Sequence, residues 1–273
     1  MSARALIKTL APPLLLSLLQ RYSGRAMRYA GHSTDWSQAL SMSSGYAATS
    51  ILERVTEATR AVVSGRARYE RDAVLFTEAE HPFALLAALW RAAALGGGRL
   101  DVVDFGGSLG SSYRQSRPLL DGLQQLQWRV VEQPAFVATG QREFSTDELS
   151  FTDSLESLPP CAGVRVVLAS SVLQYLNDPY AVLDAFTGVG AEHLIIDRTP
   201  MSGNPTDRLC IQHVPKQIYA ASYPCWILSK SKLLERLSRN WHLVCDFPCA
   251  DGTARTDDGV PFEFRGLVLE RSS

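Results

Sequence analysis

The sequence predicts an α/β fold in which a mostly parallel sheet follows a helical N-terminal extension. Apolar residues recur at helical spacing across residues 30–98, whereas strand-like and helix-like segments alternate regularly from residue 99 onward. Between the two parts, the segment RLDVVDFGGSLG (99–110) joins an apolar strand to a glycine turn and a helix start, as doubly wound sheets do at their opening. We therefore predict an extension over residues 1–98 and a sheet domain over residues 99–273.

The composition is that of an ordinary globular protein, with 46% hydrophobic and 20% charged residues among 273. The net charge of −1 gives no reason to expect nucleic acid as a partner. The five cysteines are scattered without a CxxC pair, which favours reduced thiols in the cytoplasm. Cys245 and Cys249 lie near His242 but lack an obvious fourth ligand, so we expect no metal site.

An apolar run near the start of the chain lies within residues 6–19, with Lys8 ahead of it and Pro12 and Pro13 inside it. The run is too short to span a bilayer, and no clear signal-peptidase site follows it. Two interpretations stay open, namely a short helix that packs on the protein body and a peripheral contact with a membrane surface. The sequence predicts no particular oligomeric state.

Three helical segments are predicted in the extension, the first of them around Trp36. The second follows a capping box formed by Ser50 and Glu53 and stops at Gly65. The third begins at Pro82 and stops at the triple glycine 96–98. A short strand over residues 73–76 is the one strand that the pattern suggests in this region.

Five parallel strands are predicted in the sheet domain, over residues 100–105, 128–131, 149–151, 164–169 and 193–196. The intervening helices are expected at 111–125 with a bend at Pro118, at 135–141, and at 179–186 with Asp178 as the N-cap. Residues 199–227 match no simple crossover. A helix at 230–237 then precedes an antiparallel pair, 241–247 and 262–269, joined by a polar loop at 250–259.

Parallel strands followed by a terminal antiparallel pair form the layout of the Rossmann-like class I S-adenosylmethionine-dependent methyltransferases. Asp104, Gly106, Ser108 and Gly110 occupy the positions of the acidic-x-Gly-x-Gly-x-Gly turn of that fold, with Gly107 adjacent and serine in place of the middle glycine. Glycines there let the backbone turn sharply and approach a ligand closely. A nicotinamide-dependent dehydrogenase is the weaker interpretation, because the last strand of the common nicotinamide fold stays parallel.

Polar residues follow the other predicted strands at the same edge of the sheet. Glu132 ends the second strand, where a carboxylate can accept both ribose hydroxyls of a nucleoside. Asp153 follows the third strand, where this fold meets the adenine. Ser170 follows the fourth strand, beside the point where methyl group and acceptor would meet, although helix capping explains this serine nearly as well.

Whole segments of the chain resemble one family, namely YERDAVLF, VVDFGGSLGSSYRQ, WRVVEQPAFVATG, VVLASSVLQYLNDPY, IIDRTP and YPCWILS. They are similar to methyltransferases found among bacterial polysaccharide and lipopolysaccharide biosynthesis proteins, over roughly residue 36 to the C-terminus. The resemblance implies a class I fold and S-adenosylmethionine as the cofactor. Carried onto this chain, it places the cofactor on Asp104, Gly106, Gly107, Ser108, Gly110, Glu132, Asp153 and Ser170. The acceptor is expected to be a small molecule, a sugar or a glycan intermediate of cell-surface polysaccharide biosynthesis.

A hydroxyl acceptor needs a base near it, and two residues are candidates for that role. Asp197 stands at the tip of the fifth strand, and His213 lies within the long segment 199–227. Asp197 could equally pair with Arg198, and His213 could equally be a partly buried histidine with a structural hydrogen bond.

Two further functions stay open. Gly106-x-Ser108-x-Gly110 also matches the GxSxG turn of serine hydrolases, with Asp197 and His213 following in the order of a triad. Against that function, the serine follows the first predicted strand, whereas a hydrolase nucleophile follows several strands. The second alternative is a non-catalytic module that holds a nucleoside or partner proteins within a glycan-assembly complex.

Overall fold

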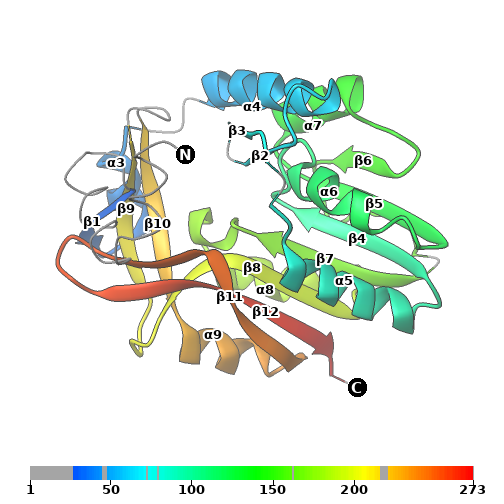
Figure 1. The fold of residues 1–273 in the computed structure, drawn as a ribbon. Coiled ribbons are helices and arrows are strands. Elements are labelled where there is room, and N and C mark those ends of the chain that lie inside the picture. The colour runs from blue at the N-terminus through cyan, green and yellow to red at the C-terminus, as the bar shows by residue number, and fades with distance from the viewer. Residues whose placement is uncertain are drawn as a thin grey trace, which may run out of the picture. The chain divides into compact units, whose positions relative to one another are not determined.

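The computed structural model describes residues 27–44, 48–71, 73–78, 80–161, 163–215 and 221–272 (Figure 1). The predicted apolar segment 6–19 lies outside the described residues. The chain divides into a smaller unit, whose described residues are 27–44, 208–215, 221–225 and 255–261, and a larger unit that holds the other described residues. Neither unit begins at residue 99, and each is described by itself below.

The larger unit is built on a mostly parallel sheet in the order β6-β5-β4-β7-β8. β12 pairs antiparallel with β8, and β11 pairs with β12. The five parallel strands lie close to their predicted positions. The fifth is longer than predicted and runs on through Pro200. The strands are β4 (Arg99–Phe105), β5 (Gln125–Val131), β6 (Leu149–Thr152), β7 (Val164–Ser170), β8 (His193–Ser202), β11 (Trp241–Arg255) and β12 (Pro261–Arg271).

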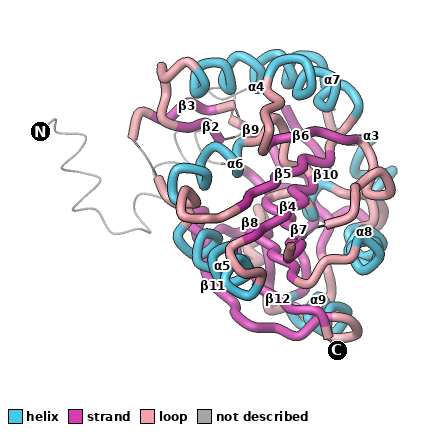
Figure 2. Tube along the Cα trace, turned by 90° about the vertical axis from the view of Figure 1, so that its right-hand side faces the viewer, coloured by secondary structure: helices cyan, strands magenta, loops and turns pink. Residues whose placement is uncertain are grey.

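Helices cover the two faces of these strands, and Figure 2 shows α5 and α8 on opposite sides of them. α5 (Phe83–Leu95) contacts β4, β7 and β8, and α7 (Pro134–Glu143) contacts β6. On the other face, α8 (Pro179–Ala185) and α9 (Lys230–Leu237) pack in one apolar cluster with Val103 and Val167. Because both faces are covered, Val102, Val103, Val166 and Val167 are fully buried, as the near-continuous apolar runs of these strands predict.

The helix after β4 is shorter than predicted. α6 spans Ser111–Ser116, and a 3-10 turn at Arg117–Leu119 follows before β5 begins at Gln125. Pro118 lacks a backbone N–H and cannot continue an α-helix. The α-helix therefore ends before Pro118, where a bend was predicted. By contrast, Asp178 caps α8 through hydrogen bonds from the N–H groups of Tyr180 and Ala181, as predicted.

The region before residue 99 is only partly helical. α4 (Ala48–Val63) and α5 are present, but α4 begins ahead of Ser50, so the predicted capping box is wrong. Gly65 ends this helical region with φ of 74°, as expected of a terminating glycine. The hairpin of β2 (Tyr69–Arg71) and β3 (Val74–Phe76) stands between the helices, and the sequence predicted its second strand alone.

The smaller unit contains strands that the sequence did not predict. β1 (Arg28–Ser33) pairs antiparallel with β9 (Arg208–Val214), and α3 (Trp36–Ser41) follows β1 with Asp35 as its N-cap. β10 (Ala221–Ser229) lies next to β9 in the sheet, so the long segment 199–227 is mainly strand. β11 likewise runs to Arg255, through much of what was predicted as a polar loop. None of the helices in the described parts of the chain is long and apolar enough to cross a bilayer.

Candidate functional site

The carboxyl ends of the parallel strands meet at one edge of the sheet and bring the predicted site residues of the larger unit together. Asp104 lies near the end of β4, Glu132 directly after β5, Asp153 after β6 and Ser170 at the end of β7. Asp197 lies within β8, opposite Ser170 in the register of the two strands. Parallel alignment alone produces this convergence, since each strand delivers its last residues to the same edge.

Asp104 is a buried carboxylate with half of its hydrogen-bonding capacity unused. Its side chain is 1% exposed, and Oδ2 accepts a 2.9 Å hydrogen bond from the indole N–H of Trp128. Oδ1 is buried and has no hydrogen-bond partner among the described residues. Burial raises the pKa of Asp104 to about 7; the Trp128 hydrogen bond lowers it, while the charges of Glu132 and Asp197 raise it further.

The glycine turn after β4 is shaped around this carboxylate. Gly107 packs directly on the Asp104 side chain, so that a Cβ there would overlap the carboxyl group. Gly106 and Gly110 have φ of 73° and 86°, and a Cβ on Gly106 would overlap Val172. Ser108 holds a positive φ of 55° without being glycine. The glycines are therefore required by backbone conformation and close packing.

Glu132 links the tip of β5 to this turn. Its carboxylate accepts a 2.6 Å hydrogen bond from the N–H of Gln133. Burial raises the pKa of Glu132, while the backbone N–H groups of Gln133 and Ser108 lower it. The acidic residue predicted to bind ribose hydroxyls thus lies beside the turn predicted to bind the rest of the ligand.

Ser170 and Asp197 form a hydrogen-bonded pair. The Ser170 hydroxyl donates to Asp197 Oδ2 at 2.8 Å, and the Cys249 thiol donates to Oδ1 at 3.4 Å. Arg198 directs its guanidinium to Asp251, at 3.0 and 3.1 Å, so the alternative that pairs Asp197 with Arg198 is wrong. Burial is the main cause of the raised pKa of the Cys249 thiol, and the nearby charge of Asp197 adds to it.

Two candidates remain, Asp153 and His213. Asp153 is exposed after β6. His213 lies on β9 in the smaller unit, opposite Arg28 of β1. The Ser108, Asp197 and His213 of the hydrolase alternative are therefore divided between the two units.

Backbone strain is concentrated at the carboxyl edge. Among the described residues, four that are not glycine have positive φ, and three of these, Ser108, Ser171 and Arg198, lie at this edge. Such conformations cost roughly 1–3 kcal/mol each and persist where the surroundings enforce them. The fully buried Gln174 helps to hold two of these conformations. Its amide N–H groups donate to Ser171 Oγ at 3.0 Å and to the Arg198 carbonyl at 3.4 Å.

A cavity of about 250 Å³ adjoins Asp197. The β2–β3 hairpin and the segment after it contribute Arg71, Glu80 and His81, and β11 contributes Cys249 and Asp251. Glu80 accepts hydrogen bonds from Tyr69 at 2.7 Å and from Arg71 at 3.0 Å. This wall of the cavity was not predicted from the sequence. The charged residues of the β2 sequence YER were the one signal for it.

The strand order now decides the fold class. Parallel strands run from β6 through β5, β4 and β7 to β8, and β12 then enters antiparallel beside β8. The chain has a class I methyltransferase fold. The prediction made from the βα pattern and the terminal strand pair is confirmed, including the glycine turn at the exit of the first parallel strand.

Several solved methyltransferase-fold structures are similar to this chain. The N-terminal domain of EvdMO1, solved with S-adenosylhomocysteine and D-fucose, is 14% identical with a TM-score of 0.48, over 78% of this chain and 97% of that chain. The 1,6-didemethyltoxoflavin N1-methyltransferase of Burkholderia thailandensis is 15% identical with a TM-score of 0.40, over 82% and 89%. The magnesium protoporphyrin IX methyltransferase of Synechocystis is 14% identical with a TM-score of 0.42, over 70% and 77%.

No family model matches the chain, and no curated protein matches it.

Proposed function

We propose that this protein is an S-adenosylmethionine-dependent methyltransferase that binds its cofactor at the carboxyl edge of β4 and β5. The observation that carries the proposal is the position of Glu132. Its carboxylate lies at the tip of β5, bonded to the N–H of Gln133 and close enough to the backbone N–H of Ser108 in the glycine turn for that group to lower its pKa. A nucleoside held by its ribose at Glu132 would have the turn beside it, where backbone groups are open to close approach.

The residues present fit this cofactor. The unsatisfied Oδ1 of Asp104 is a buried acceptor, and the α-ammonium group of S-adenosylmethionine is a cationic donor of the kind that would satisfy it. Glu132 would hold the ribose hydroxyls, and Asp153 would meet the adenine. The turn residues Gly106, Gly107, Ser108 and Gly110 would surround the methionine part, and Ser170 would lie near the sulfonium. When bound, the cofactor supplies a methyl group on an already activated leaving group.

For the acceptor, we propose a small hydroxyl-bearing molecule, a sugar or glycan intermediate of cell-surface polysaccharide synthesis, bound in the cavity beside Asp197. The cavity is lined by side chains of both charges, which suits a ligand rich in hydroxyl groups. Asp197 is our first candidate for the base, because its carboxylate lies on the cavity wall and Ser170 fixes its orientation. His213 is the second candidate. The five free thiols support a cytoplasmic setting.

Calorimetry with S-adenosylhomocysteine tests the cofactor site. We expect wild type to bind, Glu132→Ala to bind at least about tenfold more weakly, and Glu132→Gln to lie between them because it keeps one acceptor oxygen. Glu235→Ala is the matched control, since Glu235 is exposed on α9 and its side chain makes no described contact. Absence of binding in wild type, or equal affinity in all variants, would reject the site.

Transfer of tritium-labelled methyl from S-adenosylmethionine into cell-envelope glycan fractions tests the reaction. We expect label in a saccharide fraction with wild type, and loss of at least about 100-fold with Asp197→Asn if this carboxylate is the base. Asp121→Asn is the control, because it neutralises a carboxylate that is 76% exposed and does not line the cavity. A protein that binds the cofactor product but never transfers the methyl group would instead be the non-catalytic module.

A further inference from the structure

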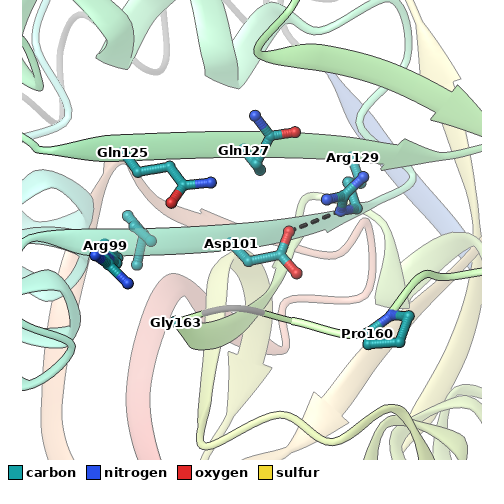
Figure 3. Close-up of a pocket in the computed structure, with 8 residues that line it drawn as sticks. Arg99, Asp101, Gln125, Gln127, Arg129, Pro160 and Gly163 are labelled. Carbon is teal, nitrogen blue, oxygen red and sulfur yellow. Dashed lines mark hydrogen bonds and ion pairs between the residues drawn. The ribbon is translucent and has the colours of Figure 1, made fainter.

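A second cavity lies at the opposite edge of the sheet, at the amino ends of β4 and β5 (Figure 3). Its volume is about 320 Å³, and its polar wall consists of Arg99 and Asp101 on β4 with Gln125, Gln127 and Arg129 on β5. Phe105 is six positions along β4 from Arg99, so this cavity is about 20 Å from the glycine turn at the rise of an extended strand. None of the proposed cofactor residues lines it.

The five polar residues share one face of the sheet, because side chains of alternate residues in a strand point the same way. Further along the same face, Val103 and Val131 are buried in the apolar cluster that α8 and α9 complete. The connection from β6 to β7 crosses this face without a helix in its described residues, 153–161 and 163. Leu155 and Leu158 of this connection pack on the apolar cluster, while Pro160 and Gly163 border the cavity. The amino end of the face is therefore left open.

The cavity wall has more hydrogen-bond donors than it uses. Asp101 is fully engaged, with Oδ1 bonded to Arg129 Nε at 2.8 Å and Oδ2 to Arg165 at 2.8 and 3.0 Å. Figure 3 shows Arg129 reaching Asp101 across the two strands. Both terminal nitrogens of Arg129, and all nitrogens of the Arg99 guanidinium, are without a hydrogen-bond partner among the described residues. Gln127 donates to the carbonyls of Leu126 and Asp147, which leaves its oxygen free.

The balance of charge favours an anion. The wall carries two arginines, Arg99 and Arg129, and one carboxylate, Asp101. That carboxylate is already paired with both Arg129 and the buried Arg165 of β7. The Arg129 side chain is 18% exposed, so its guanidinium has lost most of its water while using one of its N–H groups. A guanidinium offers its terminal N–H groups as a planar fork that matches the oxygens of a phosphate.

We propose that this cavity binds a small phosphate-bearing molecule, with Arg129 holding a phosphate group at one end of the wall, and with Arg99 and the side-chain amides of Gln125 and Gln127 contacting the rest of the molecule. A volume of about 320 Å³ is at the lower end of the range for small-molecule sites. The site is separate from the proposed methyl-transfer site and does not depend on it.

Titration calorimetry of the full-length protein with pyrophosphate and with inorganic phosphate, at constant ionic strength, tests the site. We expect saturable binding of one pyrophosphate, stronger than that of phosphate. Arg129→Gln and Arg99→Gln should each weaken it by at least about tenfold. Arg142→Gln is the control, because it removes the same charge from an exposed arginine of α7 that pairs with Glu143. S-adenosylhomocysteine should neither compete with pyrophosphate nor bind differently in the variants.

The substitutions are chosen to keep the protein folded. Arg129→Gln leaves Asp101 its two hydrogen bonds from Arg165, and Arg99→Gln removes no described partner. If Arg129→Gln fails to fold, Arg99→Gln decides the result. The proposal is overturned if wild type shows no saturable binding, if the variants bind as wild type does, if Arg142→Gln weakens binding equally, or if S-adenosylhomocysteine displaces pyrophosphate.

Discussion

The two edges of β4 each carry a buried aspartate, and the two are stabilised differently. Asp101, 4% exposed at the amino edge, is paired with two arginines. Asp104, 1% exposed near the carboxyl edge, has one indole N–H and an unsatisfied oxygen, and burial raises its pKa to about 7. The amino edge thus has an excess of donors and the carboxyl edge an excess of acceptors.

This difference indicates what each edge lacks. Unsatisfied buried polar groups cost free energy, so each edge is left in a state that a ligand of the matching charge would improve. At the carboxyl edge that ligand is cationic where it meets Asp104, which fits the ammonium group of the proposed cofactor. At the amino edge it is anionic. The comparison yields predictions that differ in sign as well as in size.

The largest effect is expected from Asp101→Asn. It removes the charge that compensates Arg165, whose side chain is 7% exposed, and leaves two guanidinium groups facing a neutral amide. Breaking a buried ion pair on one side costs about 3–5 kcal/mol, and we expect about 3 kcal/mol because Arg165 keeps its bonds to the Val189 and Pro159 carbonyls. Urea unfolding measures the loss.

Asp121→Asn is the control for that loss, since Asp121 is 76% exposed in its surface pair with Arg117. We expect this substitution to change stability by less than about 0.5 kcal/mol. A similar cost for both substitutions would show that Asp101 is not a buried compensating charge.

Asp104→Asn is expected to act through pH. A carboxyl whose pKa is about 7 when folded and 3.8 when unfolded binds more protons in the folded state between these values. Wild-type stability should therefore fall by about 2.5 kcal/mol between pH 5 and pH 8. The variant cannot titrate, so this part of the pH dependence should vanish. Urea unfolding at pH 5 and pH 8 without ligand gives the slope, and equal slopes for both proteins would contradict the prediction.

Gly107→Ala tests the packing of the turn on Asp104. A methyl group there overlaps the Asp104 carboxyl, and overpacking of this kind costs typically 1–3 kcal/mol. Gly203→Ala is the control, because a Cβ at Gly203 meets no atom within 4 Å. If thermal unfolding shows equal shifts for both substitutions, Gly107 is not held by its contact with Asp104.

The elements that local sequence specifies were predicted well. The helix expected at residues 230–237 matches α9, and Asp178 caps α8, because caps and helical periodicity depend on neighbours in sequence. The turn after β4 was found for the same reason. The helix after it was predicted too long, since the effect of Pro118 was underestimated.

Contacts between distant segments were not predictable in the same way. β1 and β9 pair across about 180 residues of sequence, and neither carries a strong strand pattern by itself. The Ser170–Asp197 hydrogen bond and the five-residue wall of the amino-edge cavity both follow from strand register, which a single sequence does not reveal. Gln174 is a polar residue within the apolar run 172–176, and such a residue indicates a buried side chain with hydrogen-bond partners at this edge of the sheet.

The smallest effect is expected from Ser108→Gly, which restores the glycine common at this position of the turn. The φ of 55° costs a serine more than a glycine, while glycine loses more backbone entropy on folding, so stability should change by less than about 1 kcal/mol. If the hydroxyl contacts the cofactor, Ser108→Gly and Ser108→Ala should both weaken the binding of S-adenosylhomocysteine by a few-fold. This is the scale of one neutral hydrogen bond. Methyl transfer should persist in both variants. A complete loss of methyl transfer with unchanged affinity for S-adenosylhomocysteine would contradict this prediction, because it would give the Ser108 hydroxyl a role in the chemical step.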